Sequence, residues 1–380
     1  YAGSPVKFHF HKAKFDLFYL LGRENYFLRK NISRAQWREM LRLPSPSVRP
    51  HLVRQGVREV ARRGDVMVLL DSSWKPSLIE VFSNLEKRGL KMRVMVYDMI
   101  PISAPGYVVK SLAQTFALWL KRSAEYATSY ITISHSVRRE LEQFLLTCGM
   151  TQPVTALPLV QSYPMREDLA AQGPLAELIG PEDYPLFSTG LAFDDRVRAL
   201  GQRPFVLCAG TIECRKNPLR LAQAWLRLIE RGEGDVPKLV FAGRMGWMIE
   251  DFNGLMHATG NLYGYAEIIE EPSVAALGFL YGNCRLLAMP SLYEGWGLPV
   301  GEALSFGKTA VVSRCSSLPE VGQDLVEYCN PASVRSIADA AWQLIETPKR
   351  REALEARIAE ADLRTWADVA RDLHAILVEA

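Results

Sequence analysis

The feature that most constrains this chain is the alternation of short apolar runs with helical stretches along its second half. Apolar runs of strand length occur at residues 205–209, 238–242, 285–289 and 309–313. The stretches between them predict helices at 218–231, 273–281 and 299–306. Strands that are apolar on both faces and separated by helices are typical of a parallel sheet covered on both sides. The second half therefore predicts a doubly wound α/β domain.

The first half repeats this alternation, with predicted strands at residues 66–70, 93–97 and 129–133. A polar residue follows each strand: Asp71, Asp98 and Ser134. Because ligands of such sheets bind beyond the carboxyl ends of the strands, these three positions are candidate site residues. The first 65 residues contain basic and helical stretches but show no glycine-rich turn from strand to helix.

Chain length and breaker residues predict two domains. A chain of 380 residues exceeds what one hydrophobic core usually fills. Residues 161–203 are rich in Pro, Gly and acidic side chains and predict a linker. We therefore expect an N-terminal domain over residues 1–195 and a C-terminal domain over residues 196–365, with a binding cleft between them.

Composition narrows the class of protein. Hydrophobic residues make up 48% and charged residues 23%, values ordinary for a soluble globular protein. No apolar run reaches the roughly 18 to 20 residues needed to span a bilayer, and no signal-peptide pattern is evident. Six cysteines without a Cys-x-x-Cys pair fit a reducing cytoplasm. Because residue 1 is Tyr, we expect either a trimmed chain or one piece of a larger polypeptide.

Charge is spread unevenly along the chain. Residues 1–195 hold 25 Lys and Arg against 19 Asp and Glu, a net charge of +6, whereas residues 196–380 carry a net charge of −3. A basic first half suits an anionic partner or membrane surface, and an ordinary solvated surface explains it equally well. The basic residues lack the interleaved aromatic side chains of a nucleic-acid module, so no nucleic-acid partner is expected.

The run from Cys208 to Pro218 predicts an anion site. A strand ends near residue 209, Gly210 allows a tight turn, and Asn217 followed by Pro218 predicts the start of a helix. Arg215 and Lys216 thus precede a helix N-terminus, and a diphosphate is the natural occupant of such a site. A solvated Arg-Lys pair at a loop tip is the alternative.

The run from Pro290 to Glu302 also follows an apolar strand. Its glycines Gly295 and Gly297 leave backbone N–H groups free to face a ligand, and Glu302 is expected in the first turn of the next helix. Glu294 lies on the loop, with seven residues between the two carboxylates. The pair suits contacts with sugar and ribose hydroxyls. A structural turn with capping glutamates is the alternative.

Together these runs make the chain resemble the family 4 retaining glycosyltransferases, which have the two-domain GT-B fold. Glu294 and Glu302 match the family's Glu-x7-Glu motif, and residues 210–217 match its Gly-Thr-x-Glu-x-Arg-Lys-Asn loop. Residues 241–247 and 316–322 in the second half, and residues 97–101 and 133–136 in the first, are also similar. The resemblance covers roughly residues 90–380 and is densest over 205–330.

The resemblance implies a nucleotide-sugar donor, linked to GDP or UDP, and no cofactor or metal. It implies that Arg215 and Lys216 hold the donor diphosphate, that Glu294 binds the transferred sugar and that Glu302 binds the ribose. Further donor contacts are implied at Gly210, Thr211, Arg244, Gly295, Trp296, Gly297 and Leu298. No Asp-x-Asp segment suited to a metal diphosphate is present.

The acceptor side rests on Asp98 and Ser134. Asp98 either contacts the acceptor or caps backbone groups of residues 102–107. Ser134 and Ser136 are candidates for contacts with acceptor or donor, and Ser136 alternatively serves as the N-cap of a helix over residues 137–146, with His135 at its start. The chain differs from many family members in carrying Tyr97 where they have His.

The last helix, expected over residues 366–378, has Val369, Leu373, Ile376 and Leu377 on one face. In the family such a helix crosses back to the first domain, so residues 366–380 are expected to pack there after a crossover at 363–365. Two basic stretches, 49–63 and 109–122, are candidate membrane contacts, with ordinary surface helices as the alternative.

The functional expectation is a retaining, metal-independent mannosyltransferase that uses GDP-mannose to extend a polysaccharide or a lipid-linked glycan. Its expected location is the cytoplasm, either free or peripheral on the inner face of the membrane, as in lipopolysaccharide synthesis. The alternative is a non-catalytic domain of a larger synthase that binds a nucleotide sugar or a glycan.

Overall fold

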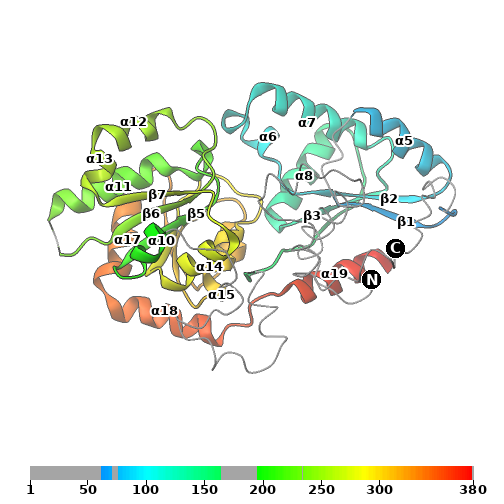
Figure 1. Cartoon of the computed structure of the whole chain (residues 1–380). Helices are drawn as coiled ribbons and strands as arrows, with labels where there is room; N and C mark the ends of the chain where they lie inside the picture. The colour runs from blue at the N-terminus through cyan, green and yellow to red at the C-terminus, as the bar shows by residue number, and fades with distance from the viewer. Residues whose placement is uncertain (1–60, 71–75, 164–194, 233, 379–380) are drawn as a thin grey trace, which may run out of the picture.

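Two parallel β-sheets with helices on their faces form the computed structural model, which describes residues 61–70, 76–163, 195–232 and 234–378 (Figure 1). The first sheet has the order β1-β2-β3-β4, with strands Val66–Leu69, Lys91–Val96, Ser129–Thr132 and Val154–Ala156. The second has the order β10-β9-β8-β5-β6-β7. In strand number order, from β5 to β10, its bounds are Phe205–Ala209, Lys238–Gly243, Ala266–Glu270, Leu286–Met289, Ala310–Ser313 and Glu327–Cys329. We call the elements around the two sheets the first and the second domain.

Helices connect the parallel strands, as parallel pairing requires. In the first domain they are α5 Pro76–Lys87, α6 Ile100–Ser103, the 3-10 turn η1 Pro105–Tyr107, α7 Lys110–Ser123 and α8 His135–Thr147. The second domain begins with α10 Asp195–Leu200, η3 Cys214–Lys216, α11 Pro218–Arg231, α12 Glu250–Ala258, α13 Gly260–Tyr263 and α14 Val274–Asn283. It continues with α15 Leu298–Ser305, α16 Leu318–Gly322, α17 Val334–Glu346 and α18 Pro348–Glu360. The helix α19 Trp366–Val378 follows the second domain.

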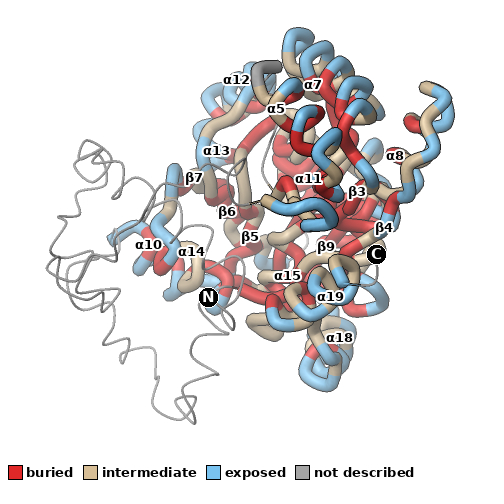
Figure 2. The backbone as a smooth tube through the Cα atoms, turned by 90° about the vertical axis from the view of Figure 1, so that its right-hand side faces the viewer, coloured by how far each residue is buried: buried red, intermediate tan, exposed pale blue. Residues whose placement is uncertain are grey.

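The central strands of the second sheet, β5 and β8, are apolar because helices cover both faces of the sheet (Figure 2). Alternate residues of β5 enter different cores: Phe205 and Leu207 pack towards α14 and α15, whereas Val206 packs towards α11 and α17. In the first sheet, Val94 packs with α5, α7 and α8, and Met95 enters the same core as Leu207. One hydrophobic core therefore continues from one sheet to the other.

The C-terminal helix α19 lies against the first sheet, although it follows the second domain in sequence (Figure 1). Nη1 of the buried Arg93 in β2 donates a hydrogen bond of 2.5 Å to the carbonyl oxygen of Ile376. The segment before α19 is also fixed, because Arg364 O accepts from Gln161 N at 2.8 Å and Arg364 Nε donates to Pro158 O at 2.8 Å. The apolar face of α19 thus joins the core shared by both sheets.

Two expectations about membrane contact can be compared with the structure. In α7, which forms most of the stretch 109–122, Trp119 and Leu120 are buried in the first domain, whereas Leu118 is exposed. This burial pattern fits the alternative of an ordinary amphipathic surface helix. Residues 49–60 of the second basic stretch, Asp71 and most of the predicted linker lie outside the described residues. Among the helices that the structure describes, none is long and apolar enough to cross a bilayer.

Candidate functional site

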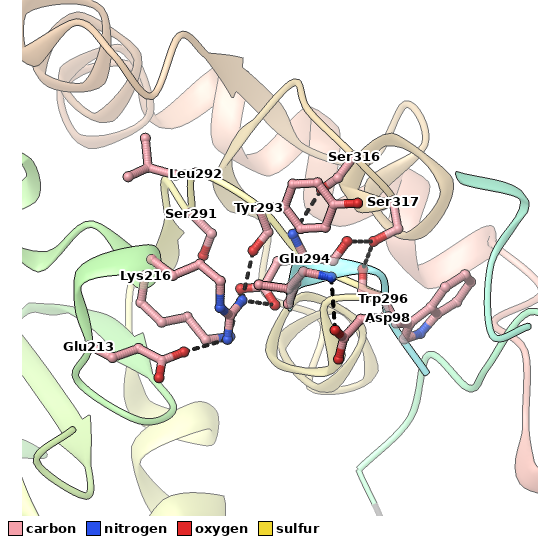
Figure 3. Close-up of polar contacts among 12 residues, drawn as sticks. Asp98, Glu213, Lys216, Ser291, Leu292, Tyr293, Glu294, Trp296, Ser316 and Ser317 are labelled. Carbon is pink, nitrogen blue, oxygen red and sulfur yellow. Dashed lines mark hydrogen bonds and ion pairs between the residues drawn. The ribbon is translucent and has the colours of Figure 1, made fainter. Parts of the chain in front are cut away.

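The predicted site residues gather where strands of both sheets end. Strands β5 and β8 are neighbours in the second sheet, with Val206 paired to Leu286, so the loops that follow them leave from adjacent positions. These loops are residues 210–217 and 290–297. Strand β2 of the first sheet ends just before Asp98, which faces the second of these loops (Figure 3).

The start of the first loop is held by close backbone packing. Gly210 has a φ of 118°, which favours glycine, and a Cβ atom on Gly243 would lie only 1.9 Å from Gly210 O. Beyond this contact, Ile212 forms a parallel bridge with Met245 and continues the pairing of β5 with β6. The loop therefore leaves the sheet in a fixed direction.

Asn217 closes the same loop in a way that the sequence did not predict. It occupies the N-cap position of α11 with Pro218 at the first turn, as expected, but its side chain makes no capping bond. The side-chain amide instead donates to Pro290 O at 2.9 Å and to Pro331 O at 2.8 Å. Its φ of 63° turns the chain sharply before the helix. Asn217 thus ties the loop to the two segments beside it.

A cluster of four charges lies between the two loops (Figure 3). Glu294 bridges the two predicted cations, with Oε2 at 2.7 Å from Arg215 Nη1 and Oε1 at 2.6 Å from Lys216 Nζ. Arg215 Nη2 lies 2.5 Å from Glu213 Oε1. The side chain of Glu294 is 7% exposed and those of Arg215 and Lys216 are 14% exposed. The structure therefore brings Arg215, Lys216 and Glu294 into direct contact.

Burial and charge act in opposite directions on this cluster. Burial disfavours the ionised form of Glu294, but Lys216 and Arg215 outweigh it and lower the pKa of the carboxyl below its ordinary value. Burial likewise disfavours the charged form of Arg215, and Glu294 and Glu213 raise the pKa of the guanidinium. Glu294 and Arg215 thus each favour the charged form of the other, and pairing offsets the cost of burying them.

Two serines fix the backbone of the second loop. Glu294 N donates to Ser316 Oγ at 2.9 Å, and Ser317 Oγ lies 2.9 Å from the carbonyl oxygens of both Glu294 and Trp296 (Figure 3). The indole of Trp296 is buried and donates to Val160 O at 3.0 Å. The side chain of Trp296 is therefore used within the protein, which leaves its backbone for the predicted donor contact.

Gly295 brings the two domains into contact. A Cβ atom at this position would lie 2.4 Å from Tyr97 O and 2.9 Å from Asp98 Cβ. Gly297 has a φ of 112° and precedes α15, where a side chain would also collide with Leu318. Both predicted glycines are thus required by geometry: one by the approach of the first domain, and the other by the turn into the helix.

The predicted ribose ligand Glu302 lies further along α15 than the sequence suggested. The helix begins at Leu298 rather than at Pro299, so Glu302 is beyond its first turn and gains less from the helix dipole. Glu302 Oε2 accepts a hydrogen bond of 2.8 Å from the hydroxyl of Tyr281. Burial and the nearby Glu302 raise the pKa of Tyr281 well above its ordinary value, so the phenol stays protonated as a donor.

Asp98 is the predicted acceptor-side residue and lies opposite the charge cluster (Figure 3). Its Oδ1 accepts a hydrogen bond of 3.0 Å from Ile100 N, so it caps α6 two residues earlier than the predicted range of 102–107. Burial raises the pKa of this carboxyl, and the carboxylates of Glu294 and Glu140 add to the effect. The Ile100 amide and Arg215 oppose the shift without overcoming it.

The start of α8 corrects one prediction. The N-cap is Ser134, whose Oγ accepts from Val137 N at 3.0 Å, whereas Ser136 lies within the helix. The helix therefore begins at His135 and not at residue 137, because the Ser134 hydroxyl caps the amide three residues further on. Ser134 is fully buried, and its hydroxyl is used for capping.

The other predicted donor contacts lie around the same loops. Thr211 is half-buried next to Gly210, and Leu298 is half-buried at the start of α15. Arg244 is exposed just after β6, and its carbonyl oxygen accepts from Ile212 N at 2.9 Å. Arg244 is therefore close to the first loop in the backbone pairing of the sheet.

Sequence reasoning assigned no role to three residues that complete this arrangement. Glu213 pairs with Arg215, and its place inside the loop motif was an available signal. The hydroxyl of Tyr293 donates to Glu140 of α8, and the carbonyl oxygen of Tyr293 accepts from Arg215 Nη1 at 2.7 Å. Burial raises the pKa of Tyr293 and Glu140 reinforces the shift, so this hydroxyl stays protonated. Glu140 is 153 residues away in sequence, so no local pattern could have revealed this pair.

The chain is similar to known glycosyltransferases in sequence. Residues 193–361 match the family model "Glycosyl transferases group 1". "Serotype-specific mannosyltransferase WbdA" of Escherichia coli is 23% identical over 282 residues, which cover 73% of this chain and 33% of that protein. "O-antigen chain mannosyltransferase B" of Escherichia coli is 33% identical over 168 residues, or 44% of each chain. This chain thus spans less than half the length of either relative.

Among solved structures, HepE of Anabaena in complex with UDP and glucose superposes with a TM-score of 0.58 at 12% identity. The superposition covers 83% of this chain and 78% of that one. At this identity the likeness shows the fold alone, which is the predicted GT-B fold of two facing parallel-sheet domains. The second domain is thus similar to group 1 glycosyltransferases, and the chain is mannosyltransferase-like in sequence.

Proposed function

We propose that this chain transfers a mannosyl group from GDP-mannose to a growing polysaccharide or lipid-linked glycan, with retention of the anomeric configuration. The observation that carries the proposal is the buried carboxylate of Glu294 between Arg215 and Lys216, which lies opposite Asp98 of the other domain. The mannosyl group is supported by the relatives, which are named mannosyltransferases. Nucleotide binding is supported by HepE, which was solved with UDP and glucose.

Arg215 and Lys216 are proposed to bind the diphosphate of the donor. Two cations and the N-terminus of α11 offer a positive site for an anion of charge about −2. They would stabilise the charge on the departing nucleoside diphosphate, and preorganised groups of this kind supply a large share of catalysis. With these charges in place, the reaction would need no metal. Within the described parts of the chain there is no group of three or more acidic, His or Cys side chains that could hold a metal ion.

Glu294 is proposed to change partner when the donor binds. In the structure it neutralises both cations, and the diphosphate would replace it on them. The carboxylate would then be free to bind hydroxyls of the transferred sugar, while Glu302 would bind the ribose. Gly210, Thr211, Arg244 and the backbone of residues 295–298 would complete the donor site.

The proposed reaction breaks the bond between the anomeric carbon and the donor phosphate oxygen, and forms a bond to an acceptor hydroxyl. The hydroxyl proton passes to the leaving phosphate oxygen on the same face of the sugar. Asp98 would orient the acceptor. Ser134 would act indirectly, because its hydroxyl caps α8.

A lipid-linked acceptor would bring the first domain to a membrane surface on the cytoplasmic side. Lys110, Lys121 and Arg122 are exposed on α7, and Leu118 is 59% exposed on the same helix. Basic residues near an anionic bilayer each contribute about 1 kcal/mol to attraction. One exposed apolar residue supports only peripheral association.

Donor binding and transfer are tested separately. GDP and GDP-mannose should raise the Tm of the protein more than UDP, ADP or their sugars do, because a ligand that binds only the folded state stabilises it.

Arg215→Ala should lower kcat about 10²- to 10³-fold. Glu294→Gln should abolish transfer yet bind GDP about tenfold more tightly, because the neutral side chain no longer competes for the cations.

Glu327→Gln is the matched control, since Glu327 is paired with Arg350 at 2.6 Å in the same domain and away from the cations. It should keep both transfer and GDP affinity. Wild-type turnover in Arg215→Ala would refute the site. Nucleotide binding with no transfer from any donor would instead indicate a non-catalytic binding domain of a larger synthase.

A further inference from the structure

The segment of residues 316–322 resembles the family, yet the proposed reaction gives it no role. It follows β9 and contains the short helix α16 of the second domain. Its serines hold the loop that carries Glu294: Ser316 accepts from Glu294 N, and Ser317 contacts the carbonyl oxygens of Glu294 and Trp296, all at 2.9 Å. One end of this segment therefore supports the proposed donor loop.

The other end of the segment reaches the first domain. The carboxylate of Glu320 accepts two hydrogen bonds from the backbone of α8, one from His135 N at 2.8 Å and one from Ser136 N at 2.7 Å. These amides belong to the first turn of a 13-residue helix, where backbone N–H groups lack partners within the helix. A carboxylate at this end also interacts favourably with the helix dipole.

The contact with Glu320 gives the first backbone amides of α8 hydrogen-bond acceptors. Ser134 accepts from the amide of Val137, and Glu320 accepts from the two amides before it. One cap thus comes from the first domain and the other from the second. The two-oxygen contact fixes both the distance and the orientation of α8 relative to the segment.

We propose that Glu320 is a positioning residue that sets the first domain in register with the donor site. This inference rests on the proposed glycosyl transfer. Residues 316–320 connect the first turn of α8 to the backbone of Glu294, through bonds of 2.7 to 2.9 Å at every step. Loss of the Glu320 contact leaves the donor groups Arg215, Lys216 and Glu294 in place within the second domain. It weakens the link between the acceptor side and these groups, because α8 keeps the Tyr293 contact through Glu140 but loses the contact at its first turn.

Separate effects on binding and turnover follow from this arrangement. Glu320→Ala should leave the affinity for GDP within about twofold of wild type, since the cations belong to the second domain. It should lower kcat about tenfold or more, because small displacements of aligned groups are costly to the reaction. Amide exchange of Ser136 should be about tenfold faster, because a hydrogen bond to a charged group is lost. Glu320→Asp, one methylene shorter, should show the same changes.

A second pair of variants tests the contact from the other side without altering Glu320. His135→Pro removes the N–H that reaches Glu320 but suits the first position of a helix. Ser134 already has an extended backbone, with φ −158° and ψ 162°, as a residue before proline requires. His135→Ala keeps the N–H and removes only an exposed side chain. His135→Pro should lower kcat at least threefold, and His135→Ala should not.

Amide exchange of Ser136 and kcat of the variants together decide whether Glu320 positions α8. Wild-type exchange of Ser136 in Glu320→Ala would overturn it, and this measurement needs no substrate. Faster exchange with unchanged kcat in a turnover-competent enzyme would also overturn it. If wild type transfers no sugar, the proposed function fails, while exchange still decides whether Glu320 holds α8. Equal kcat in His135→Pro and His135→Ala would show that the contact has no role in turnover. Non-additive effects of Glu320→Ala and His135→Pro on kcat would support direct coupling.

Discussion

Single residues in the cleft hold charges that burial does not favour. Asp98 is half-buried beside Glu294 and Glu140, and only one backbone amide and Arg215 offset the loss of water around it. Its pKa is therefore raised, whereas the pKa of Glu294, which contacts two cations, is lowered. A carboxyl whose pKa is raised by burial among other charged groups is a candidate for a functional role.

Asp98→Asn should stabilise the protein at neutral pH and lower transfer. The raised folded-state pKa of Asp98 means that its ionised form disfavours folding, so the benefit of the neutral amide is present above the folded-state pKa. The benefit should disappear as the pH falls below 3.8, the ordinary pKa of the carboxyl, because Asp98 is then protonated in both states. Urea unfolding of both proteins across pH 3 to 8 measures this difference.

Asp98→Asn should also change the kinetics of sugar transfer. If Asp98 orients the acceptor, Asp98→Asn should raise the acceptor KM or lower kcat about tenfold, with the affinity for GDP unchanged. A variant that is neither more stable at pH 7 nor slower in transfer would contradict the assignment of Asp98.

At the scale of elements, the central strands were predictable from their apolar runs, whereas most edge strands were not. The apolar run at 205–209 became β5 with the predicted bounds, and 218–231 became α11. The strands that the sequence did not reveal are β4, β7 and β10, each at an edge of its sheet. Edge strands are buried on fewer sides, so they are short or carry charges such as Glu267 and Glu270, and the apolar signal is lost.

The candidate site shows the same limit. Glu294, Arg215 and Lys216 were predicted because their loops follow apolar strands and carry a family motif. The role of Glu320 was not predictable, because its partners are backbone amides 184 and 185 residues away. The cap of α8 was misplaced by two residues because two serines offer equivalent hydroxyls, and only the fold decides which one is used.

The loop between β8 and α15 approaches the first domain closely at Gly295. Gly295→Ala adds a Cβ atom that would lie 2.4 Å from Tyr97 O, so either the loop or the first domain must move. We expect a loss of about 1 to 3 kcal/mol in the free energy of unfolding and a large fall in kcat. The affinity for GDP should fall much less, because the cations lie on a different loop.

Gly254→Ala is the matched control for this substitution. Gly254 lies in α12, and no atom is within 4 Å of the Cβ position. Alanine there should raise stability by about 0.5 to 1 kcal/mol through its helix propensity. Chemical unfolding and transfer assays on both variants separate the effect of an added methyl group from the effect of its place. Equal behaviour of the two variants would contradict close packing at Gly295.

At the scale of the whole molecule, the two domains are joined at several places of different chemistry. The shared hydrophobic core and α19 hold them on one side, whereas polar contacts hold them near the candidate site. Trp247 Nε1 donates to Tyr107 O at 2.9 Å, and Tyr293 donates to Glu140. Burial of apolar surface favours contact between the domains but does not fix their relative orientation. The polar contacts are directional and select one orientation. A reaction between groups on different domains depends on both.

Arg93 makes a polar contact with α19, the helix whose apolar face joins the shared core. It is 6% exposed in the centre of the first sheet, and its guanidinium donates to Ile376 O in the last turn of α19, where a cation also complements the helix dipole. Arg93→Met keeps the apolar stem but removes the donor. The free energy of unfolding should fall by about 1 to 3 kcal/mol. Protease cleavage within α19 should become faster than global unfolding allows, because the end of the helix is released first.

Arg122→Met is the control. Arg122 is exposed and paired only with Glu125 in the described structure, so this variant should change the free energy of unfolding by less than about 0.5 kcal/mol. Cleavage of α19 at the wild-type rate in Arg93→Met would show that the apolar face alone holds this helix in place.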